Sequence, residues 1–239
     1  MSANNDPVRT AAGQAHSLTD GSLMFAFAHD VRAHLRTVLT RIQLVQCSTT
    51  TPLSPEDQRF LQEAAEAVDD ISGLLSAMQA FCEAGPGEGL MNLRLLLRGL
   101  LLEVKHVLQE VGAEVELSND VDQPVPTGLQ RILKELLTNA SKFRSPARPL
   151  RIHIATRQEP DGRVEIAVSD NGLGVSAEYL DVIFSPFQRL HARDAFPGYG
   201  LGLATVRRIA GTMGGTVAAT PVPEGGLSVR IVLPAASRD

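Results

Sequence analysis

The chain has 239 residues, of which 44% are apolar and 21% are charged, and its net charge is −5 at neutral pH. This length and composition suit one or two globular domains with an ordinary hydrophobic core. Because the charge is negative and the basic residues are scattered, nothing indicates nucleic acid or an anionic membrane as a partner.

The sequence shows no signal for membrane insertion or secretion. No apolar stretch reaches the ~20 residues of a transmembrane helix, and the best candidate, 93–104, contains two arginines and a glutamate. The first residues lack the basic and then apolar pattern of a signal peptide. We therefore expect a cytoplasmic protein without membrane insertion.

A helical hairpin is predicted for residues 18–83, after a disordered tail at 1–17. In the first helix apolar residues recur in steps of three and four, as one helix face requires: Leu23, Phe27, Val31, Leu35, Val38, Ile42 and Val45. After a loop at 48–55, Ser54 is placed to cap the second helix and Pro55 to occupy its first position. Two such helices leave an apolar stripe uncovered, so pairing into a four-helix bundle predicts a homodimer.

A linker is predicted at 84–91, where glycine and proline cluster, and a second domain at 92–239. Its expected helices are 92–111, 127–143 and 200–213, and its expected strands are 113–117, 151–157, 163–170, 216–220 and 227–233. This mixture of strands and helices predicts a two-layer α/β sandwich. The fold class of the whole chain is thus α+β.

Short segments in a fixed order carry the functional signal: Glu135-Leu-Leu-Thr-Asn-Ala-Ser-Lys-Phe, Asp170-Asn-Gly-Leu-Gly, Phe184-Ser-Pro-Phe and Gly198-Tyr-Gly-Leu-Gly-Leu. This succession resembles the N, G1, F and G2 boxes of the ATP-binding domain of sensor histidine kinases. Upstream, Phe27-Ala-His-Asp-Val-Arg resembles the phospho-acceptor box of the same family. The resemblance implies the Bergerat-type ATP fold that gyrase, Hsp90 and MutL share.

The first box suits the metal and the phosphates of ATP. The carboxamide oxygen of Asn139 is a hard neutral ligand, which suits Mg²⁺. Glu135 lies one turn earlier on the same face, where a carboxylate can hold a metal-bound water or act as a base. Lys142, three residues after Asn139, can reach a phosphate as a point charge.

The second box suits adenine. Asp170 ends a predicted strand, and its carboxylate accepts hydrogen bonds only, as reading an exocyclic amine requires. Gly172 and Gly174 let the backbone turn and pass close to a purine.

The last box suits the phosphates, because Gly198, Gly200 and Gly202 lie where a loop enters a helix. The free amides and the positive dipole end of that helix would face the phosphates, and Leu201 belongs to the same nucleotide-binding box. No strand leads directly into these glycines, so they do not form a Rossmann motif.

The segment 187–197 is expected to form a lid over ATP. It carries Gln188, Arg189, His191 and Arg193, basic and polar groups that could close over the triphosphate. Phe184 and Phe187 are expected to anchor the lid on the core, and Phe187 and Arg189 are counted among the nucleotide-binding residues. The run Phe-Gln-Arg-Leu-His resembles the lid of phytochrome-associated histidine kinases.

His29 is the expected phospho-acceptor, with Asp30 beside it to orient the ring and take its proton. Two positions depart from the family pattern. Ala33 stands where phosphatase-competent members often have Thr or Asn, so we expect weak phosphatase activity. His34 stands where the family usually has a proline that bends the helix.

The resemblance implies a kinase that phosphorylates His29 from Mg-ATP and passes the phosphoryl group to an aspartate of a response regulator. The alternative is a histidine phosphotransfer protein with an inert ATP-like domain, although the intact boxes disfavour it. A serine kinase of the anti-sigma-factor type is disfavoured by the His29-Asp30 hairpin. The signal, the cognate regulator, and phosphorylation within or between subunits stay open.

Overall fold

A computed structural model describes residues 7–48, 53–190 and 196–235, with side chains from Phe27 onward except at position 48. The chain forms two compact units, Met1–Glu83 and Ala84–Asp239. Within the described ranges, every helix is too short or too polar to span a bilayer.

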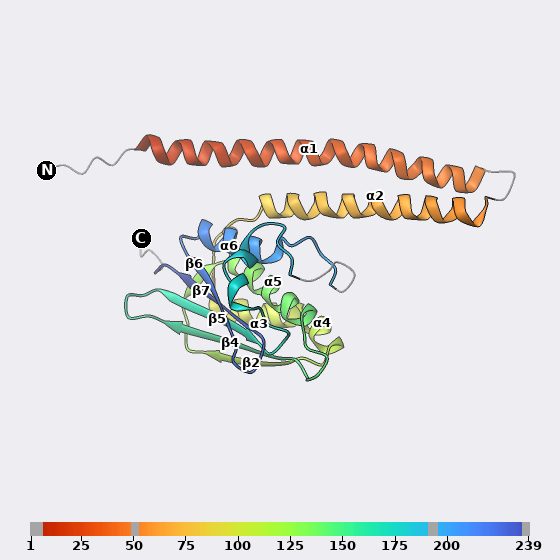
Figure 1. The fold of residues 1–239 in the computed structure, drawn as a ribbon. Coiled ribbons are helices and arrows are strands. Elements are labelled where there is room, and N and C mark those ends of the chain that lie inside the picture. The colour runs from red at the N-terminus through yellow and green to blue at the C-terminus, as the bar shows by residue number, and fades with distance from the viewer. Residues whose placement is uncertain (1–6, 49–52, 191–195, 236–239) are drawn as a thin grey trace. The chain divides into compact units, whose positions relative to one another are not determined.

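The N-terminal unit is a helical hairpin of α1 (Pro7–Ser48) and α2 (Pro55–Cys82), as Figure 1 shows. The predicted cap is confirmed, because Ser54 Oγ accepts a 3.1 Å hydrogen bond from the Asp57 N–H and Pro55 opens the helix. Ala28, Ile42, Val68 and Leu75 are buried. Arg32 Nη2 donates across the hairpin to Gln79 Oε1 at 2.5 Å.

Helix α1 begins earlier than expected, at Pro7 instead of near residue 18. Proline is favoured at a first helical position, and the alanines at 11, 12 and 15 are strong helix formers, so the stretch we expected as a tail continues the helix. Residues 1–6 of that predicted tail lie outside the described residues.

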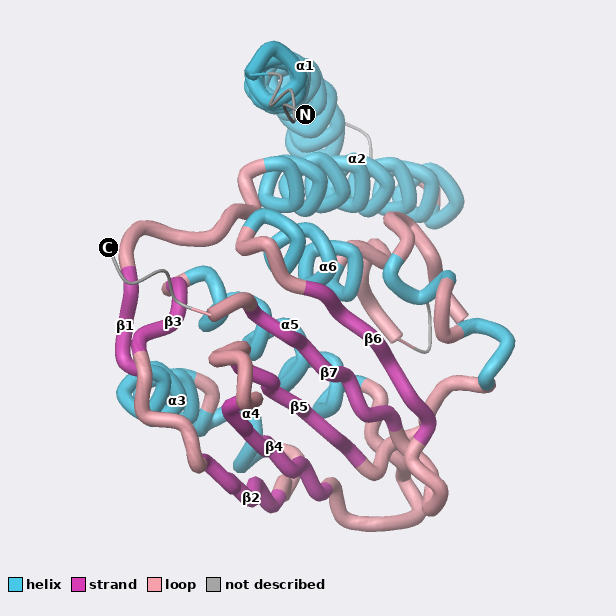
Figure 2. Tube along the Cα trace, turned by 90° about the vertical axis from the view of Figure 1, so that its left-hand side faces the viewer, coloured by secondary structure: helices cyan, strands magenta, loops and turns pink. Residues whose placement is uncertain are grey.

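The C-terminal unit contains a five-stranded sheet in the order β2-β4-β5-β7-β6 (Figure 2). Its strands are β2 (Glu114–Asn119), β4 (Arg151–Gln158), β5 (Val164–Asp170), β6 (Thr216–Pro221) and β7 (Leu227–Leu233). Strand β2 is parallel to β4, and the other neighbours are antiparallel. The predicted hairpin between β4 and β5 is confirmed.

Helices cover one face of this sheet, as the views in Figures 1 and 2 agree. They are α3 (Leu93–Glu103), α4 (Lys105–Glu110), α5 (Gly128–Lys142) and α6 (Gly202–Thr212), and short 3-10 turns lie at Ala177–Tyr179 and Val182–Phe184. One hydrophobic core joins the helices to alternate strand residues such as Ile152, Ile154, Ile166 and Ile231. The predicted two-layer α/β sandwich is therefore confirmed.

The structure differs from the prediction in two places, the linker expected at 84–91 and the helix expected after it. Within 84–91, β1 (Leu90–Asn92) begins and pairs with β3 (Pro124–Pro126). The Gly128 N–H also donates to Pro86 O at 2.6 Å, so backbone contacts hold part of this segment on the sandwich. The helix expected over 92–111 breaks at Val104, and Leu100 before the break and Leu108 after it both belong to the core.

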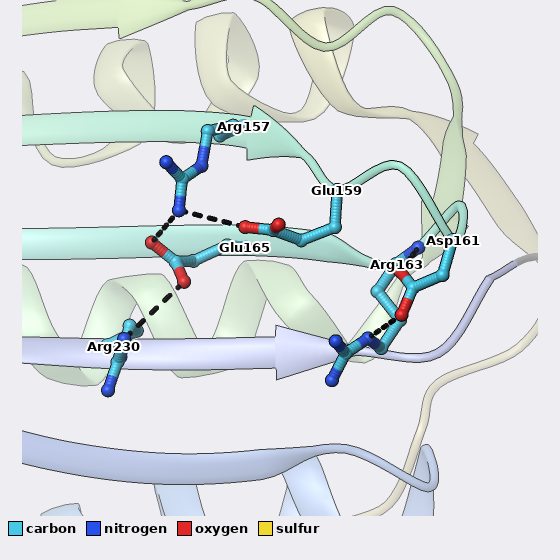
Figure 3. Close-up of polar contacts among 6 residues, drawn as sticks. All are labelled: Arg157, Glu159, Asp161, Arg163, Glu165 and Arg230. Atoms are coloured by element: carbon cyan, nitrogen blue, oxygen red, sulfur yellow. Dashed lines mark hydrogen bonds and ion pairs between the residues drawn. The ribbon is translucent and has the colours of Figure 1, made fainter.

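The other face of the sheet carries ion pairs, shown in Figure 3. Glu165 on β5 lies 3.7 Å from both Arg157 on β4 and Arg230 on β7. Arg157 also lies 2.8 Å from Glu159. Alternation along the strands thus places apolar residues against the helices and charged residues on the open face.

Candidate nucleotide-binding site

Helix α5 presents the three residues of the first box together. Its apolar side, which includes Ile132, Leu133 and Leu136, packs into the core. Glu135, Asn139 and Lys142 follow at steps of four and three and are half-buried. Helical spacing therefore places a carboxylate, a carboxamide and an ammonium group along one line.

The first turn of α6 comes close to that line. A methyl group on Gly202 would lie 3.1 Å from Glu135 Oε2 and 3.5 Å from Asn139 Nδ2. A methyl group on Gly198 would lie 3.1 Å from Lys142 Nζ. The structure thus brings the first and last boxes together, and because both positions are glycine, no Cβ fills the space beside these polar groups of α5.

Burial changes the ionisation of two of these groups. The pKa of the Glu135 carboxyl is raised by burial, against the opposing charges of Arg131 and Lys134. The pKa of the Lys142 ammonium is lowered by burial and then by the nearby charge of Arg189. The largest cause of both pKa shifts is desolvation of the charged form. An anion beside Lys142 or a cation beside Glu135 would stabilise that charged form.

The loop after β5 contacts the end of α5. The Gly172 N–H donates to Asp170 Oδ1 at 2.8 Å, and the Leu173 N–H donates to Phe143 O at 2.9 Å. Burial raises the pKa of Asp170, against the N–H groups of Gly172 and Leu227 and the charge of Arg148. Gly174 approaches Gly226 of the β6–β7 turn, where a methyl group would lie 2.9 Å from Gly226 O.

Arg148, which precedes β4, and the side chain of Asn171 hold this loop through hydrogen bonds that sequence reasoning missed. Arg148 donates to Asn171 O, Gly172 O and Glu224 O. The Asn171 side chain accepts from the Arg151 N–H at 2.8 Å and donates to Pro149 O at 2.9 Å. Asn171 lies within the second box and could have been considered from the sequence. No motif in the sequence indicates which carbonyl groups Arg148 binds.

The described part of the lid lies against the last box. Phe187 has a left-handed backbone with φ of 64°, and its N–H donates to Gly200 O at 3.0 Å. Phe184 is buried as expected, but the Phe187 side chain is 51% exposed, so it does not serve as the apolar anchor we expected. Arg189 Nη2 donates to Phe196 O at 2.9 Å. His191 and Arg193 lie outside the described residues.

His29 and Asp30 belong to the N-terminal unit and are not part of this cluster. On α1, His29 Nδ1 lies 3.3 Å from Asp30 Oδ1, with side-chain exposures of 66% and 78%. Nδ1 is thus the ring nitrogen directed at the carboxylate, and Nε2 is the other ring nitrogen.

The cluster in the C-terminal unit fits a magnesium-bound nucleotide. Amide and carboxylate oxygens of Asn139 and Glu135 are ligands of the kind Mg²⁺ takes, and Lys142 supplies a positive charge for phosphate. The glycines at 198 and 202 leave room that a Cβ would fill beside these groups. Asp170 offers a half-buried acceptor at the neighbouring loop.

Comparisons with known proteins point the same way. Residues 125–237 match the family described as histidine kinase-, DNA gyrase B-, and HSP90-like ATPase. The chain is 29% identical to cyanobacterial phytochrome A of Nostoc sp., over 77% of this chain and 24% of that protein. It is 31% identical to the sensor histidine kinase GtrS of Pseudomonas aeruginosa, over 90% of this chain and 42% of that protein. The chain thus spans less than half of these relatives.

Among solved structures, full-length ShkA in complex with AMPPNP has the same fold. Its TM-score is 0.65 at 24% identity, over 90% of this chain and 46% of that chain. Together with the family match over residues 125–237, these similarities support a histidine kinase ATP-binding core in this chain.

Proposed function

We propose that this chain transfers the γ-phosphoryl group of Mg-ATP to His29 and then to an aspartate of a response regulator. The observation that carries the proposal is the convergence of Glu135, Asn139 and Lys142 on Gly198 and Gly202 in a histidine-kinase ATP-binding core. An exposed histidine–carboxylate pair in a helical hairpin supplies the acceptor. Because the donor would be cytosolic ATP, we place the reaction in the cytoplasm.

At the acceptor, the neutral ring attacks through Nε2. The new N–P bond forms as the bond from the γ-phosphorus to the β,γ-bridging oxygen breaks, and ADP leaves with that electron pair. The ring then carries a positive charge, and Asp30 takes the proton from Nδ1. Exposure of His29 gives a donor domain and a receiver domain access to the same nitrogen.

At the donor site, each group has a separate task. Asn139 and Glu135 would hold Mg²⁺, directly or through water, and Lys142 would bind a phosphate oxygen. Bound Mg²⁺ supplies charge neutralisation on the phosphate oxygens. Asp170 would accept from the adenine amine, while the loop from Gly198 through Gly200 and Leu201 to Gly202 would present amides to the phosphates.

We also propose that the hairpin dimerises. Several large apolar side chains of the hairpin are exposed within a single chain: Phe27, Val38, Leu44, Val45, Phe60 and Ile71. A second hairpin that completes a four-helix bundle would bury them. A receiver domain would dock on the same hairpin near His29, where the apolar side chain of Leu35 is partly exposed.

The test is incubation with γ-labelled ATP and Mg²⁺, followed by acid and base treatment of the protein. We expect acid-labile, base-stable label in the wild type and none in His29→Gln or Asn139→Ala. His34→Gln is the matched control, because it removes another exposed histidine of α1 and should retain the label. Addition of a receiver domain should then move the label to it.

Three results would contradict the proposal. Label that survives in His29→Gln would place the acceptor elsewhere. Binding of ATP to the wild type without any labelling would leave an ATP-binding protein that is not an autokinase under those conditions, and absence of both would favour the phosphotransfer scaffold with an inert ATP-like domain.

A further inference from the structure

Arg148 connects two segments that are distant in the sequence. Its Nε donates to Asn171 O at 2.7 Å and its Nη2 to Gly172 O at 3.1 Å, both in the loop after β5. Its Nη1 donates to Glu224 O at 2.6 Å, in the turn between β6 and β7. Each of the three nitrogens of one guanidinium group therefore binds a different backbone carbonyl.

The turn is built to receive this side chain. Gly225 has φ of 93°, and a methyl group there would collide with Arg148 Nη2. At Gly226, a methyl group would collide with Asp170 O. The turn thus lies directly against Asp170 on one side and against the guanidinium group on the other.

Two of the three hydrogen bonds of Arg148 end at the residues that directly follow Asp170. Gly172 both accepts from Arg148 through its carbonyl oxygen and donates its N–H to Asp170 Oδ1 at 2.8 Å. The direction of that N–H depends on the orientation of the same loop. Hydrogen bonds thus connect Arg148 to the Asp170 carboxylate through the backbone of Gly172.

Arg148 is itself exposed to solvent and lies outside the hydrophobic core. If it were replaced, water could reach the freed carbonyl groups, so the core would stay intact. Asn171 would still hold the loop to Arg151 and Pro149. Replacement of Arg148 should therefore change the orientation of the loop without unfolding the protein.

We propose that Arg148 is a positioning residue that sets nucleobase specificity by holding the loop of Asp170 in the orientation that accepts the adenine amine. This inference rests on the adenine-reading role proposed for Asp170. Guanine carries a carbonyl where adenine carries that amine, so the Asp170 contact distinguishes the two bases. A loosened loop should lose affinity for ATP and retain its weaker affinity for GTP.

The test is calorimetric titration of the full chain with Mg-ATP and with Mg-GTP. In Arg148→Gln we expect the affinity for ATP to fall by about tenfold and the affinity for GTP to stay within about twofold. Arg148→Lys should lie between, because an ammonium group cannot reach all three carbonyls at once. In the kinase assay the same change should raise KM for ATP and leave kcat nearly unchanged.

Arg151→Gln is the matched control. It removes the same charge three residues later, from a side chain that is paired with Glu114 on β2 at 3.1 Å. It should bind both nucleotides like the wild type.

The possible results distinguish a failure of the inference about Arg148 from a failure of the proposed role of Asp170. Unchanged ATP affinity in Arg148→Gln, or an equal loss for ATP and GTP, would overturn the inference and leave the proposed function standing. A wild type that binds ATP no better than GTP would overturn the role of Asp170 and the inference with it.

Discussion

At the scale of single residues, Gly202 offers a test of the donor site. A methyl group there would lie 3.1 Å from Glu135 Oε2 and 3.5 Å from Asn139 Nδ2, both ends of side chains that can shift. We therefore expect Gly202→Ala to weaken Mg-ATP binding by about tenfold, a loss of about 1.4 kcal/mol, while the protein stays folded. Calorimetric titration and thermal melting would measure the two effects.

Gly211 in the same helix is the matched control, because nothing lies within 4 Å of a methyl group there. Gly211→Ala should bind ATP normally and gain up to about 1 kcal/mol of stability from helix propensity. Equal ATP affinity in both variants would mean that the start of α6 does not adjoin the bound nucleotide.

At Asp170 we expect nucleotide binding and protein stability to place opposite demands on the side chain. Burial raises its pKa above the usual 3.8, so the folded chain holds this proton more tightly than the unfolded chain does. The stability contributed by protonated Asp170 is therefore present below that usual value and is lost as pH rises through the raised pKa. At neutral pH the buried carboxylate costs stability, which ATP binding would offset.

We expect Asp170→Asn to melt at neutral pH no lower than the wild type, since the amide oxygen can still accept from the Gly172 N–H. The increase in melting temperature on adding ATP should disappear. Melting curves between about pH 4 and pH 8, with and without ATP, would check both points. A variant that melts lower but still responds to ATP would contradict this account.

At the scale of elements, the ion pairs of the open sheet face should contribute little to stability. Glu165 is 20% exposed, but its partners Arg157 and Arg230 are 67% and 54% exposed. Glu165→Gln should lower the free energy of unfolding by less than about 1 kcal/mol. Urea denaturation would measure this difference, which should shrink in about 1 M salt. A loss that stays large in salt would show that the pairs are not solvent-screened.

Elements that depend on a local sequence pattern could be predicted, and those that depend on contacts between distant segments could not. The cap at Ser54, the β4–β5 hairpin and the helices of the ATP site rest on spacing and turn residues within one segment. The β1–β3 pair and the three carbonyl partners of Arg148 join segments far apart in sequence. Neither carries a periodic pattern, and so neither was foreseen.

The candidate site was also predictable only in part. The boxes predicted which residues come together, because each box is short and its residue types are tied to nucleotide chemistry. The exposure of Phe187 and its left-handed backbone were not predictable, since no periodic pattern in the sequence indicates either of them. The early start of α1 was missed because composition suggested disorder where alanine-rich sequence continues the helix.

At the scale of the whole molecule, each unit has its own packing, so association and nucleotide binding should be separable. Val38 and Ile71 are 46% and 45% exposed, on α1 and α2 of the hairpin. A charge at both positions would be buried without a partner in a four-helix bundle, which costs several kcal/mol. The double variant Val38→Asp, Ile71→Asp should therefore be monomeric by analytical ultracentrifugation, while the wild type is dimeric.

Leu102→Asp supplies the control, because it places the same charge on an exposed leucine of the C-terminal unit, 73% exposed on α3. It should remain dimeric. All three proteins should bind Mg-ATP equally, since the nucleotide residues and their core belong to the C-terminal unit. A dimer that survives in the hairpin variant and dissociates in Leu102→Asp would move the interface from the hairpin to the ATP-binding unit.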